Sequence, residues 1–397
     1  MEYISYIVIP FVSAFVGWIT NFIAIKMLFF PTNYFGLRPF GWQGIIPANA
    51  LKMTNNAVDL MVDKLIKIKI IFARLDPQVI AEKIEPSLTL ISKQIVDEVM
   101  FAQAPHLWKN LSMSKRKIVY DKVKKYFPET IENTIIDINE NINELIDFKK
   151  IAAETLLNDK KLITEIFLDV GKKEFKFIER SGLFLGFVFG ILQLVVIMYF
   201  PYWWVFTVGG VIVGLLTNYI ALQLIFTPVN ETRILGIKFH GLFLRRQKHV
   251  AKNYSKIISE KMLTIEQLFD GIFKISNNGK IEKIIEKNIN DLIDKSLGGL
   301  DKLINIIFDK NKIEVIKNIA SYRFIQEVPI AITNTYEYAH KQLDIQKTIE
   351  NKMANLPSKD FISFLRPIFK QEEWKLIIAG AILGGYAGVI QYFISFH

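Results

Sequence analysis

Apolar residues are concentrated in four long runs, at residues 3–30, 182–200, 203–227 and 376–396. A helix needs about 20 apolar residues to cross the hydrocarbon core of a bilayer, and each run is close to or above that length. Lys26 is the only charged residue within the four runs. This pattern predicts four transmembrane helices and therefore an integral membrane protein.

The stretches between the runs, residues 31–181 and 228–375, combine charged and apolar residues with helical spacing. Apolar residues recur about every 3.6 positions across residues 60–72 and again across 281–293, which is typical of amphipathic helices. No sustained two-residue alternation is present, so strands are not expected. We predict an all-α fold with four transmembrane helices and two soluble helical domains. The alternative is that some of these helices lie flat on the bilayer.

Helix boundaries in these stretches are marked by a few local signals. Thr264 and Gln267 have the spacing of a capping box, in which each side chain bonds to the backbone of the other at a helix start. The expected interruptions are Pro77, Pro86, Pro105, Pro128 and the sequence Asn277-Asn278-Gly279. Proline and Asn-Gly sequences commonly end helices.

The first and third runs share a motif. GWITNFIAIKMLFFP begins at Gly17, and GLLTNYIALQLIFTP begins 197 residues later at Gly214. The second and fourth runs match at a separation of 198 residues. We therefore expect an internal repeat, residues 1–200 and 201–397, in which each half is a membrane helix, a soluble segment and a second membrane helix. Two crossings per half make the halves parallel repeats about an axis along the membrane normal.

Small residues form a stripe along each predicted span, because residues three and four apart share one face of a helix. Glycines in such a stripe let two helix backbones approach closely, which favours association in lipid. The packing candidates are Gly17, Gly182, Gly186, Gly190, Gly214, Gly380, Gly384 and Gly388.

Polar residues also lie within the spans. The intramembrane candidates are Thr20, Asn21, Gln193, Thr217, Asn218 and Gln391. An unpaired amide in hydrocarbon costs several kcal/mol, so we expect Asn21 to bond to Asn218, Gln193 or Gln391 on a neighbouring helix. Two interpretations stay open: these amides set the register of a four-helix bundle, or they line a polar path along its axis. Lys26 faces away from the stripe and is expected to extend to the interface.

The charge distribution suggests an orientation. The chain has 49 Lys and Arg against 39 Asp and Glu, a formal net charge of +10. Many of these cations flank the soluble sides of the predicted spans, and such residues favour the cytoplasm. We expect cytoplasmic soluble segments, with both termini and the turn near Trp203 outside. The first run is too long for a cleaved signal peptide and is expected to stay attached.

One basic cluster follows the third run closely and consists of Arg245, Arg246, Lys248, His249 and Lys252. Such a cluster binds anionic lipid headgroups in many membrane proteins. A plain topological flank is the other interpretation.

Other chemistry has little support in the sequence. There is no cysteine, and the five histidines lack the spacing of a helical metal site. We find no phosphate-binding glycine loop and no nucleophile elbow. We therefore expect no cofactor, no metal, no enzymatic activity and no nucleic-acid partner. A homo-oligomer or an unidentified protein partner is compatible with the sequence.

Several motifs together resemble a known family. They are GWITNFIAIKMLFFP, GWQGIIP, LNDKKLITEIFLDVGKKEFKFIERSGLFLGFVFGILQ, GLLTNYIALQLIFTP, GLFLRRQKHVAKNY and GGYAGVIQ. Over nearly its whole length the chain resembles the YheB-type family of bacterial membrane proteins, a domain without assigned function. Family members usually carry basic residues after GIIP, where this chain has Ala48-Asn49-Ala50.

The resemblance supports the architecture and implies no activity. Our working hypothesis is a non-enzymatic protein of the bacterial cytoplasmic membrane that handles lipid or organises the membrane. A channel or transporter for a small solute and a membrane-anchored assembly scaffold are the alternatives. Lipid handling predicts an acyl-chain-sized groove or tunnel in the soluble domains that is continuous with the bilayer. Transport predicts a wet, amide-lined path between the spans.

Overall fold

The computed structural model describes residues 2–37, 41–234, 237–273, 279–298, 309–370 and 373–396. In the first half the helices are α1 (Glu2–Phe29), α2 (Ile45–Ala48), α3 (Ala50–Leu60), α4 (Ile68–Phe72), α5 (Pro77–Gln103), α6 (Pro105–Asn110), α7 (Met113–Glu140), α8 (Ile142–Leu145), α9 (Phe148–Asn158) and α10 (Lys160–Tyr199). In the second half they are α11 (Trp203–Phe226), α12 (Leu242–Arg245), α13 (Gln247–Ile257), α14 (Ile265–Phe273), α15 (Lys280–Leu297), α17 (Lys310–Ala331), α18 (Tyr336–Leu343), α19 (Ile345–Ala354), α20 (Ser358–Lys370) and α21 (Glu373–Phe396). The predicted all-helical class is confirmed.

Shorter elements complete the described chain. Two π-helical turns, η1 (Met61–Leu65) and η2 (Ile258–Met262), continue α3 and α13, and a 3₁₀ turn, η3 (Ile332–Thr335), follows α17. Strands β1 (Thr232–Ile234) and β2 (Ile237–Phe239) pair as a small antiparallel hairpin. The sequence analysis did not anticipate this hairpin, because three-residue strands are too short to show alternation.

The chain forms two compact units. Unit 1 contains residues 1–65, 153–258 and 346–397, and unit 2 contains residues 66–152 and 259–345. Both units take residues from both intervening stretches, so the division into units does not follow the division into stretches.

Four helices of unit 1 are long and apolar enough to cross a membrane: α1, α10, α11 and α21. The predicted spans correspond to these helices, but α10 is longer than expected. It has 40 residues and begins at Lys160 rather than at residue 182. The Asp159 carboxylate accepts hydrogen bonds from the backbone N–H groups of Lys161 and Leu162 and so caps this start. The helix is not interrupted further on, because no proline lies between Lys160 and Tyr199.

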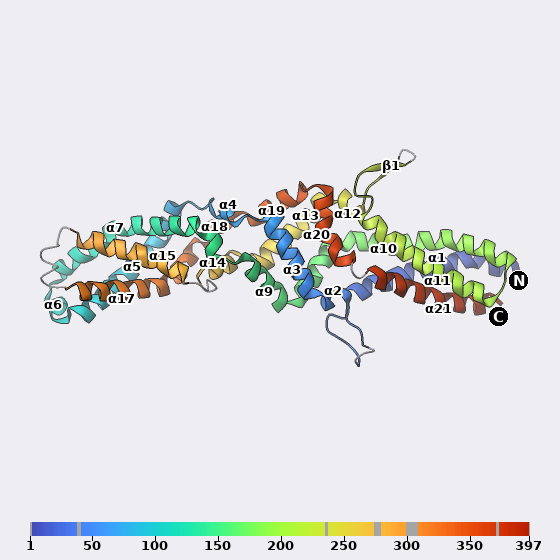
Figure 1. Ribbon diagram of the computed structural model, residues 1–397, viewed down its shortest axis with the longest axis horizontal. Coiled ribbons are helices and arrows are strands. Elements are labelled where there is room, and N and C mark those ends of the chain that lie inside the picture. Colours follow the sequence, from blue (N-terminus) through green and yellow to red (C-terminus); the bar gives the residue numbers. More distant parts are fainter. Residues whose placement is uncertain are drawn as a thin grey trace. The chain divides into compact units, whose positions relative to one another are not determined.

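The four candidate spans pack as two tight pairs, α1 with α10 and α11 with α21. The pairs join through contacts of α10 with α11 and of α1 with both α21 and α11. Figure 1 shows the four helices side by side, with the start of α1, the end of α21 and the turn between α10 and α11 at the same end of the bundle. Each pair therefore returns the chain to the end at which it started.

Several local features recur 197 residues apart. The short helices α2 and α12, the helices α3 and α13, and the turns η1 and η2 all have starts and ends separated by that number. In unit 1, α2, α3, α12 and α13 all contact α10. The part of α10 that precedes its apolar stretch is thus covered by equivalent helices from both halves.

The core of unit 2 is a second four-helix arrangement. α5 packs on α7 and α17, and α15 packs on the same two helices. Figure 1 shows α5, α7, α15 and α17 side by side, with α6 at one end of them. Each half of the chain contributes two of the four helices, so this core cannot form from one half alone.

The local signals had mixed outcomes. The capping box is confirmed, since Thr264 N donates to Gln267 Oε1 at 3.0 Å and Gln267 N donates to Thr264 Oγ1 at 3.3 Å. The prediction of one helix over residues 60–72 was wrong, because η1 ends at Leu65 and α4 begins only at Ile68. The predicted helix over residues 281–293 is confirmed as part of α15.

The prolines act in two ways. Pro77 and Pro105 occupy the first positions of α5 and α6, where the missing N–H is not needed. Pro86 and Pro128 were expected to end helices, and that expectation was wrong, since they lie inside α5 and α7. Each removes one backbone hydrogen bond, and buried apolar neighbours on both sides hold these helices together. Gly279 directly precedes α15, whereas Asn277 and Asn278 lie outside the described residues.

Candidate functional site

Asn21 and Asn218 make equivalent contacts in the two helix pairs. Asn21 Nδ2 donates to the backbone carbonyl of Ile178 on α10, and Asn218 Nδ2 donates to that of Leu376 on α21, both at 2.7 Å. The two asparagines are 0% and 3% exposed. Each amide therefore joins the two helices of its own pair, and the expected bonds between amides were wrong.

Glycines explain why the asparagines reach a backbone carbonyl. A Cβ built at Gly182 would lie 2.6 Å from Asn21 Nδ2, and one built at Gly380 would lie 2.3 Å from Asn218 Nδ2. Any larger residue at these two positions would displace the amide. The asparagine and the glycine opposite it thus form one packing unit in each pair.

The remaining packing candidates also lie where backbones meet. A Cβ at Gly17 would lie 2.2 Å from Gly182 O, and one at Gly214 would lie 2.1 Å from Gly380 O. The other positions show similar approaches: Gly186 to Ser13 O, Gly190 to Pro10 Cα, Gly384 to Gly210 O and Gly388 to Phe206 O. All eight predicted glycines therefore lie at the two tight helix contacts.

The other intramembrane polar residues bond within the bundle. Thr20 Oγ1 donates to Gly17 O, and Thr217 Oγ1 donates to Val213 O at 2.8 Å. Gln193 accepts from Ser13 Oγ at 3.2 Å and donates to Phe206 O at 3.4 Å, while Gln391 donates to Ile9 O at 3.4 Å. Most of these side chains bond to backbone carbonyls, so the polar groups do not form one continuous line.

Lys26 is exposed, and its ammonium lies 5.4 Å from the centre of the Phe30 ring.

Between the candidate spans α10 and α11 lies a cavity of about 330 Å³. Gln193 is its only amide; the other lining residues are Phe189, Leu192, Val196, Phe200, Trp204, Val205, Val208, Gly209, Ile212, Val213 and Leu216. Such an apolar surface suits an acyl chain better than water or an ion.

The basic cluster lies on α12 and α13, beside the part of α10 that precedes its apolar stretch. Arg245, Lys248, His249 and Lys252 are exposed. Lys173 on α10 is exposed as well and acts electrostatically on His249. We name Arg245, Lys248, His249, Lys252 and Lys173 the basic surface. Three helices, α10, α12 and α13, supply it, which gives it more area than a single helix face.

Arg246 has a different role from its neighbours. Its guanidinium pairs with the Glu174 carboxylate on α10, with 2.5 Å between Arg246 Nη1 and Glu174 Oε1. Glu174 is 2% exposed, and its second oxygen, Oε2, has no hydrogen-bond partner. This pair anchors the start of α13 to α10 and turns Arg246 inward, away from any headgroup.

His249 responds to this environment. Partial desolvation, followed by the nearby cations Arg246 and Lys173, lowers the pKa of His249 below its usual value near 6.5. At neutral pH the positive charge of the basic surface therefore comes from its lysines and arginine.

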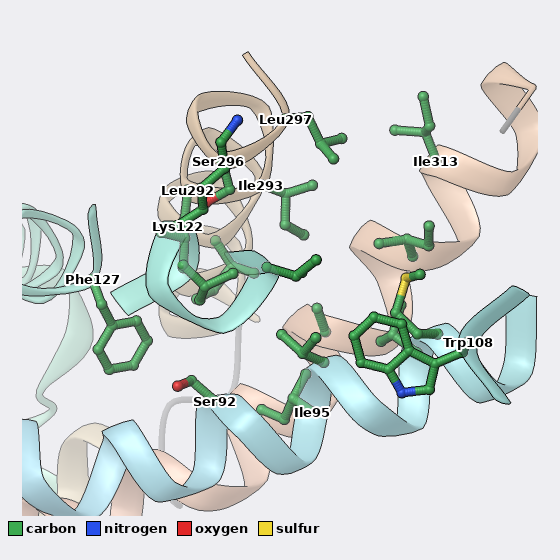
Figure 2. A pocket seen from close by; sticks show the side chains of 18 of the residues that line it. Ser92, Ile95, Trp108, Lys122, Phe127, Leu292, Ile293, Ser296, Leu297 and Ile313 are labelled. Carbon is green, nitrogen blue, oxygen red and sulfur yellow. The ribbon is translucent and has the colours of Figure 1, made fainter. Parts of the chain in front are cut away.

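Another apolar cavity lies in unit 2. A cavity of about 350 Å³ opens among α5, α6, α7, α15 and α17, where α5 and α15 end and α7 and α17 begin. Figure 2 shows side chains from several of these helices pointing into it, among them Ile95, Trp108 and Phe127. Of its described lining residues, only Ser92, Lys122 and Ser296 carry a hydroxyl or a charge. Its volume is within the range of small-molecule sites, about 300–1,000 Å³.

A hydrogen-bond network holds one wall of this cavity. Trp108 Nε1 donates to Asp97 Oδ1 at 3.0 Å, and the Tyr120 hydroxyl donates to the same oxygen. Burial and the bond to Asp97 raise the pKa of Tyr120 to about 12, so the phenol keeps its proton. Because both donors meet one carboxylate oxygen, the indole of Trp108 has a defined orientation against the cavity.

None of these lining residues was predicted to form a site; Ile289, Leu292 and Ile293 were predicted only as part of an amphipathic helix. On α5 the lining residues include Ser92, Ile95, Val96 and Val99, whose spacing is that of an ordinary buried helix face. Such a pattern shows that a face is covered, but it does not show whether side chains fill all the space behind it.

The spans and the intervening helices define a multi-pass, all-helical membrane protein. The chain is 26% identical over 205 residues to the UPF0754 membrane protein SSP0953 of Staphylococcus saprophyticus subsp. saprophyticus. This alignment covers 47% of the chain and 52% of that protein, so it spans about half the length of the relative. It indicates distant homology to the UPF0754 membrane proteins. No family model matches the sequence. No solved structure matches it either.

Proposed function

We propose that the protein binds lipid, with an acyl chain in the apolar cavity of unit 2. The observation that carries this proposal is the cavity itself, about 350 Å³ with a nearly apolar lining. The cavity is partly open to the surface. An acyl chain seated in it would remove its apolar lining from water, which is favourable at about 25 cal/mol per Å² of apolar surface buried.

Two features of unit 1 support the same role. The apolar cavity between α10 and α11 offers a second acyl-chain surface in the bilayer. The basic surface on α10 and α13 suits anionic headgroups, because each Lys or Arg near an anionic membrane contributes about 1 kcal/mol. In this proposal the role is binding rather than catalysis, and the basic surface faces the cytoplasm of a bacterial cell.

The transport alternative has weaker support. The two tight helix pairs meet backbone to backbone at their glycines, and the described cavity between α10 and α11 is apolar. A conducting path needs water or polar ligands along its length, and the amides here bond to backbone carbonyls instead.

We also propose that the two halves are copies of one unit and that the YheB-type resemblance holds along the whole chain. The equivalent Asn–carbonyl bonds, the equivalent glycine contacts and the 197-residue separation of helix boundaries support the duplication. The distant homology over about half of the chain supports the resemblance.

Native mass spectrometry of the purified full chain tests the lipid proposal. We expect a lipid to co-purify with the wild type and to be lost when Ala320→Phe places a ring in the cavity from α17. The matched control is Val315→Phe on the same helix, because Val315 is exposed and does not line the cavity. Lipids that surround the spans are common to all samples. The result is therefore the difference in bound lipid between Ala320→Phe and the other two proteins.

Circular dichroism must show that both variants are folded. If Ala320→Phe is unfolded, Val99→Phe adds a ring to the cavity from α5 instead. Retention of the same lipid by folded Ala320→Phe or Val99→Phe, at wild-type stoichiometry, would overturn the proposal.

A further inference from the structure

A second cavity adjoins the apolar one in unit 2. It has a volume of about 480 Å³ and lies between α5 and α7. Ser92, Val96 and Val123 line both cavities, so the two share a wall. Their linings differ in kind. The other described residues of the second cavity are Thr89, Lys93, Met113, Ser114, Lys117, Tyr120, Asp121 and Lys124.

The charge of the second cavity is positive. Lys93, Lys117 and Lys124 are exposed and line the cavity together with one carboxylate, Asp121. Within the described part of the chain, no ion pair joins any of these three lysines to an acid. This contrasts with Lys280, Lys287 and Lys295 of α15, each of which is paired with a carboxylate on α7 or α8. Three unpaired cations on two facing helices leave a net positive site, which we name the lysine cavity.

The lysine cavity also contains hydrogen-bond donors. Thr89 and Ser114 contribute hydroxyl groups, whereas the Ser92 hydroxyl already donates to Thr89 O at 2.9 Å. The Lys93 ammonium lies 5.3 Å from the centre of the Tyr120 ring. This cation–π contact favours a fixed position for the charge at the cavity wall. Lysines bind phosphate groups as point charges, and hydroxyls can donate to the remaining oxygens.

Asp97 links the two cavities. It accepts from Trp108, which lines the apolar cavity, and from Tyr120, which lines the lysine cavity. The same carboxylate therefore orients one side chain of each cavity. A ligand that extends from one cavity to the other would contact both Trp108 and Tyr120.

We propose that the lysine cavity binds the phosphate headgroup of the lipid whose acyl chain occupies the apolar cavity. This inference rests on the proposed function and adds the ligand class: an anionic phospholipid rather than a neutral one. Charge complementarity carries it, because Lys93, Lys117 and Lys124 outnumber Asp121 and a phosphate group would balance the remaining positive charge beside the apolar site.

Fluorescence of Trp108 provides a direct test in the full chain. Trp108 is buried against the apolar cavity, and bromine atoms on an acyl chain quench indole emission on contact. The remaining tryptophans are replaced by phenylalanine, at Trp18, Trp42, Trp203, Trp204 and Trp374. The two probes are a brominated lysophosphatidate and a brominated monoacylglycerol with the same chain.

We expect lysophosphatidate to quench Trp108 at a concentration about tenfold lower than monoacylglycerol, since tenfold corresponds to about 1.4 kcal/mol. The combined variant Lys93→Gln, Lys117→Gln and Lys124→Gln should lose this preference and retain quenching by monoacylglycerol. The matched control, Lys83→Gln, Lys115→Gln and Lys125→Gln, removes three charges from α5 and α7 outside both cavities and should keep the preference.

The outcomes separate the two proposals. Equal quenching by both probes in the wild type overturns the headgroup inference and leaves the acyl-chain cavity intact. An absence of quenching by either probe overturns the proposed function as well. If inorganic phosphate alone displaces lysophosphatidate at concentrations as low as unbrominated lysophosphatidate does, the lysines bind free phosphate, and the lipid assignment fails.

Discussion

Gly384 and Asn218 illustrate how single residues hold the spans together. A Cβ at Gly384 would lie 2.1 Å from Gly210 O, and Asn218 Nδ2 bonds to Leu376 O at 2.7 Å. Lipid offers no hydrophobic drive for helix association, so close packing and interhelical hydrogen bonds must supply it. The glycine provides the space and the asparagine provides one bond, worth about 0.6–2 kcal/mol.

We predict that Gly384→Ala lowers the stability of the folded protein in detergent by about 1–2 kcal/mol. Overpacking costs about 1–3 kcal/mol, and the better helix propensity of alanine returns up to about 1 kcal/mol. Thermal unfolding of the purified chain measures the change.

The matched control for this prediction is Gly385→Ala on the same helix. A Cβ at Gly385 would meet only Val211 Cγ2, at 2.9 Å, which is the end of a side chain rather than a backbone atom. We expect its stability to stay within about 0.5 kcal/mol of the wild type or to rise. Equal stability of the two variants would contradict the assignment of Gly384 to a backbone contact.

At the scale of elements, α10 belongs to two environments. It packs against the candidate spans α1 and α11, and it also contacts the shorter helices α2, α3, α12 and α13. The Arg246–Glu174 pair joins α13 to α10. A buried carboxylate without a partner is costly, so the guanidinium is needed wherever Glu174 is ionised.

We predict that Arg246→Gln lowers the free energy of unfolding by about 3 kcal/mol. The reason is that removing one partner of a buried pair leaves the other charge uncompensated. Chemical denaturation in detergent measures the loss.

A double variant separates charge from packing. Arg246→Gln combined with Glu174→Gln should recover most of the loss, since no buried charge remains. Lys248→Gln, an exposed change on α13, should alter stability by less than about 0.5 kcal/mol. If the double variant is less stable than Arg246→Gln alone, the pair does not act through charge compensation.

At the scale of the whole molecule, each unit is assembled from both halves of the chain. Unit 2 takes α5 and α7 from the first half and α15 and α17 from the second. Unit 1 combines one tight pair of candidate spans from each half. The two halves of the chain therefore do not form two independent domains in series.

The absence of cysteine makes the membrane orientation simple to measure, because single cysteines can be introduced without removing others. We predict that Tyr202→Cys, in the turn between α10 and α11, reacts with a membrane-impermeant maleimide in intact bacterial cells. Lys248→Cys on α13 should react only after the membrane is opened. Both follow from the preference of Lys and Arg for the cytoplasmic side.

The cysteine-free parent is the control and should not be labelled under either condition. Labelling of Lys248→Cys, but not of Tyr202→Cys, in intact cells would show that the orientation is opposite to the predicted one.

Much of the architecture could be predicted from local pattern. The four runs indicated the candidate spans, and the glycine stripes indicated which faces pack, since both depend on spacing along one helix. The partners of Asn21 and Asn218 could not be predicted, because a backbone carbonyl has no signature in the sequence. The prediction that Pro86 and Pro128 end helices failed for a related reason, because tertiary packing of α5 and α7 outweighs the loss of one hydrogen bond.

The sequence by itself determined the membrane class, the candidate spans and the glycine positions, because hydrophobicity and helical periodicity act over neighbouring residues. Only the tertiary structure decided that Arg246 faces Glu174, that α5, α7, α15 and α17 form one core, and that a partly open apolar cavity lies among these helices beside a cluster of lysines. These features depend on residues far apart in the chain. A helix face that lines a cavity has the same pattern as one that fills a core, so the difference appears only when all the helices are in place.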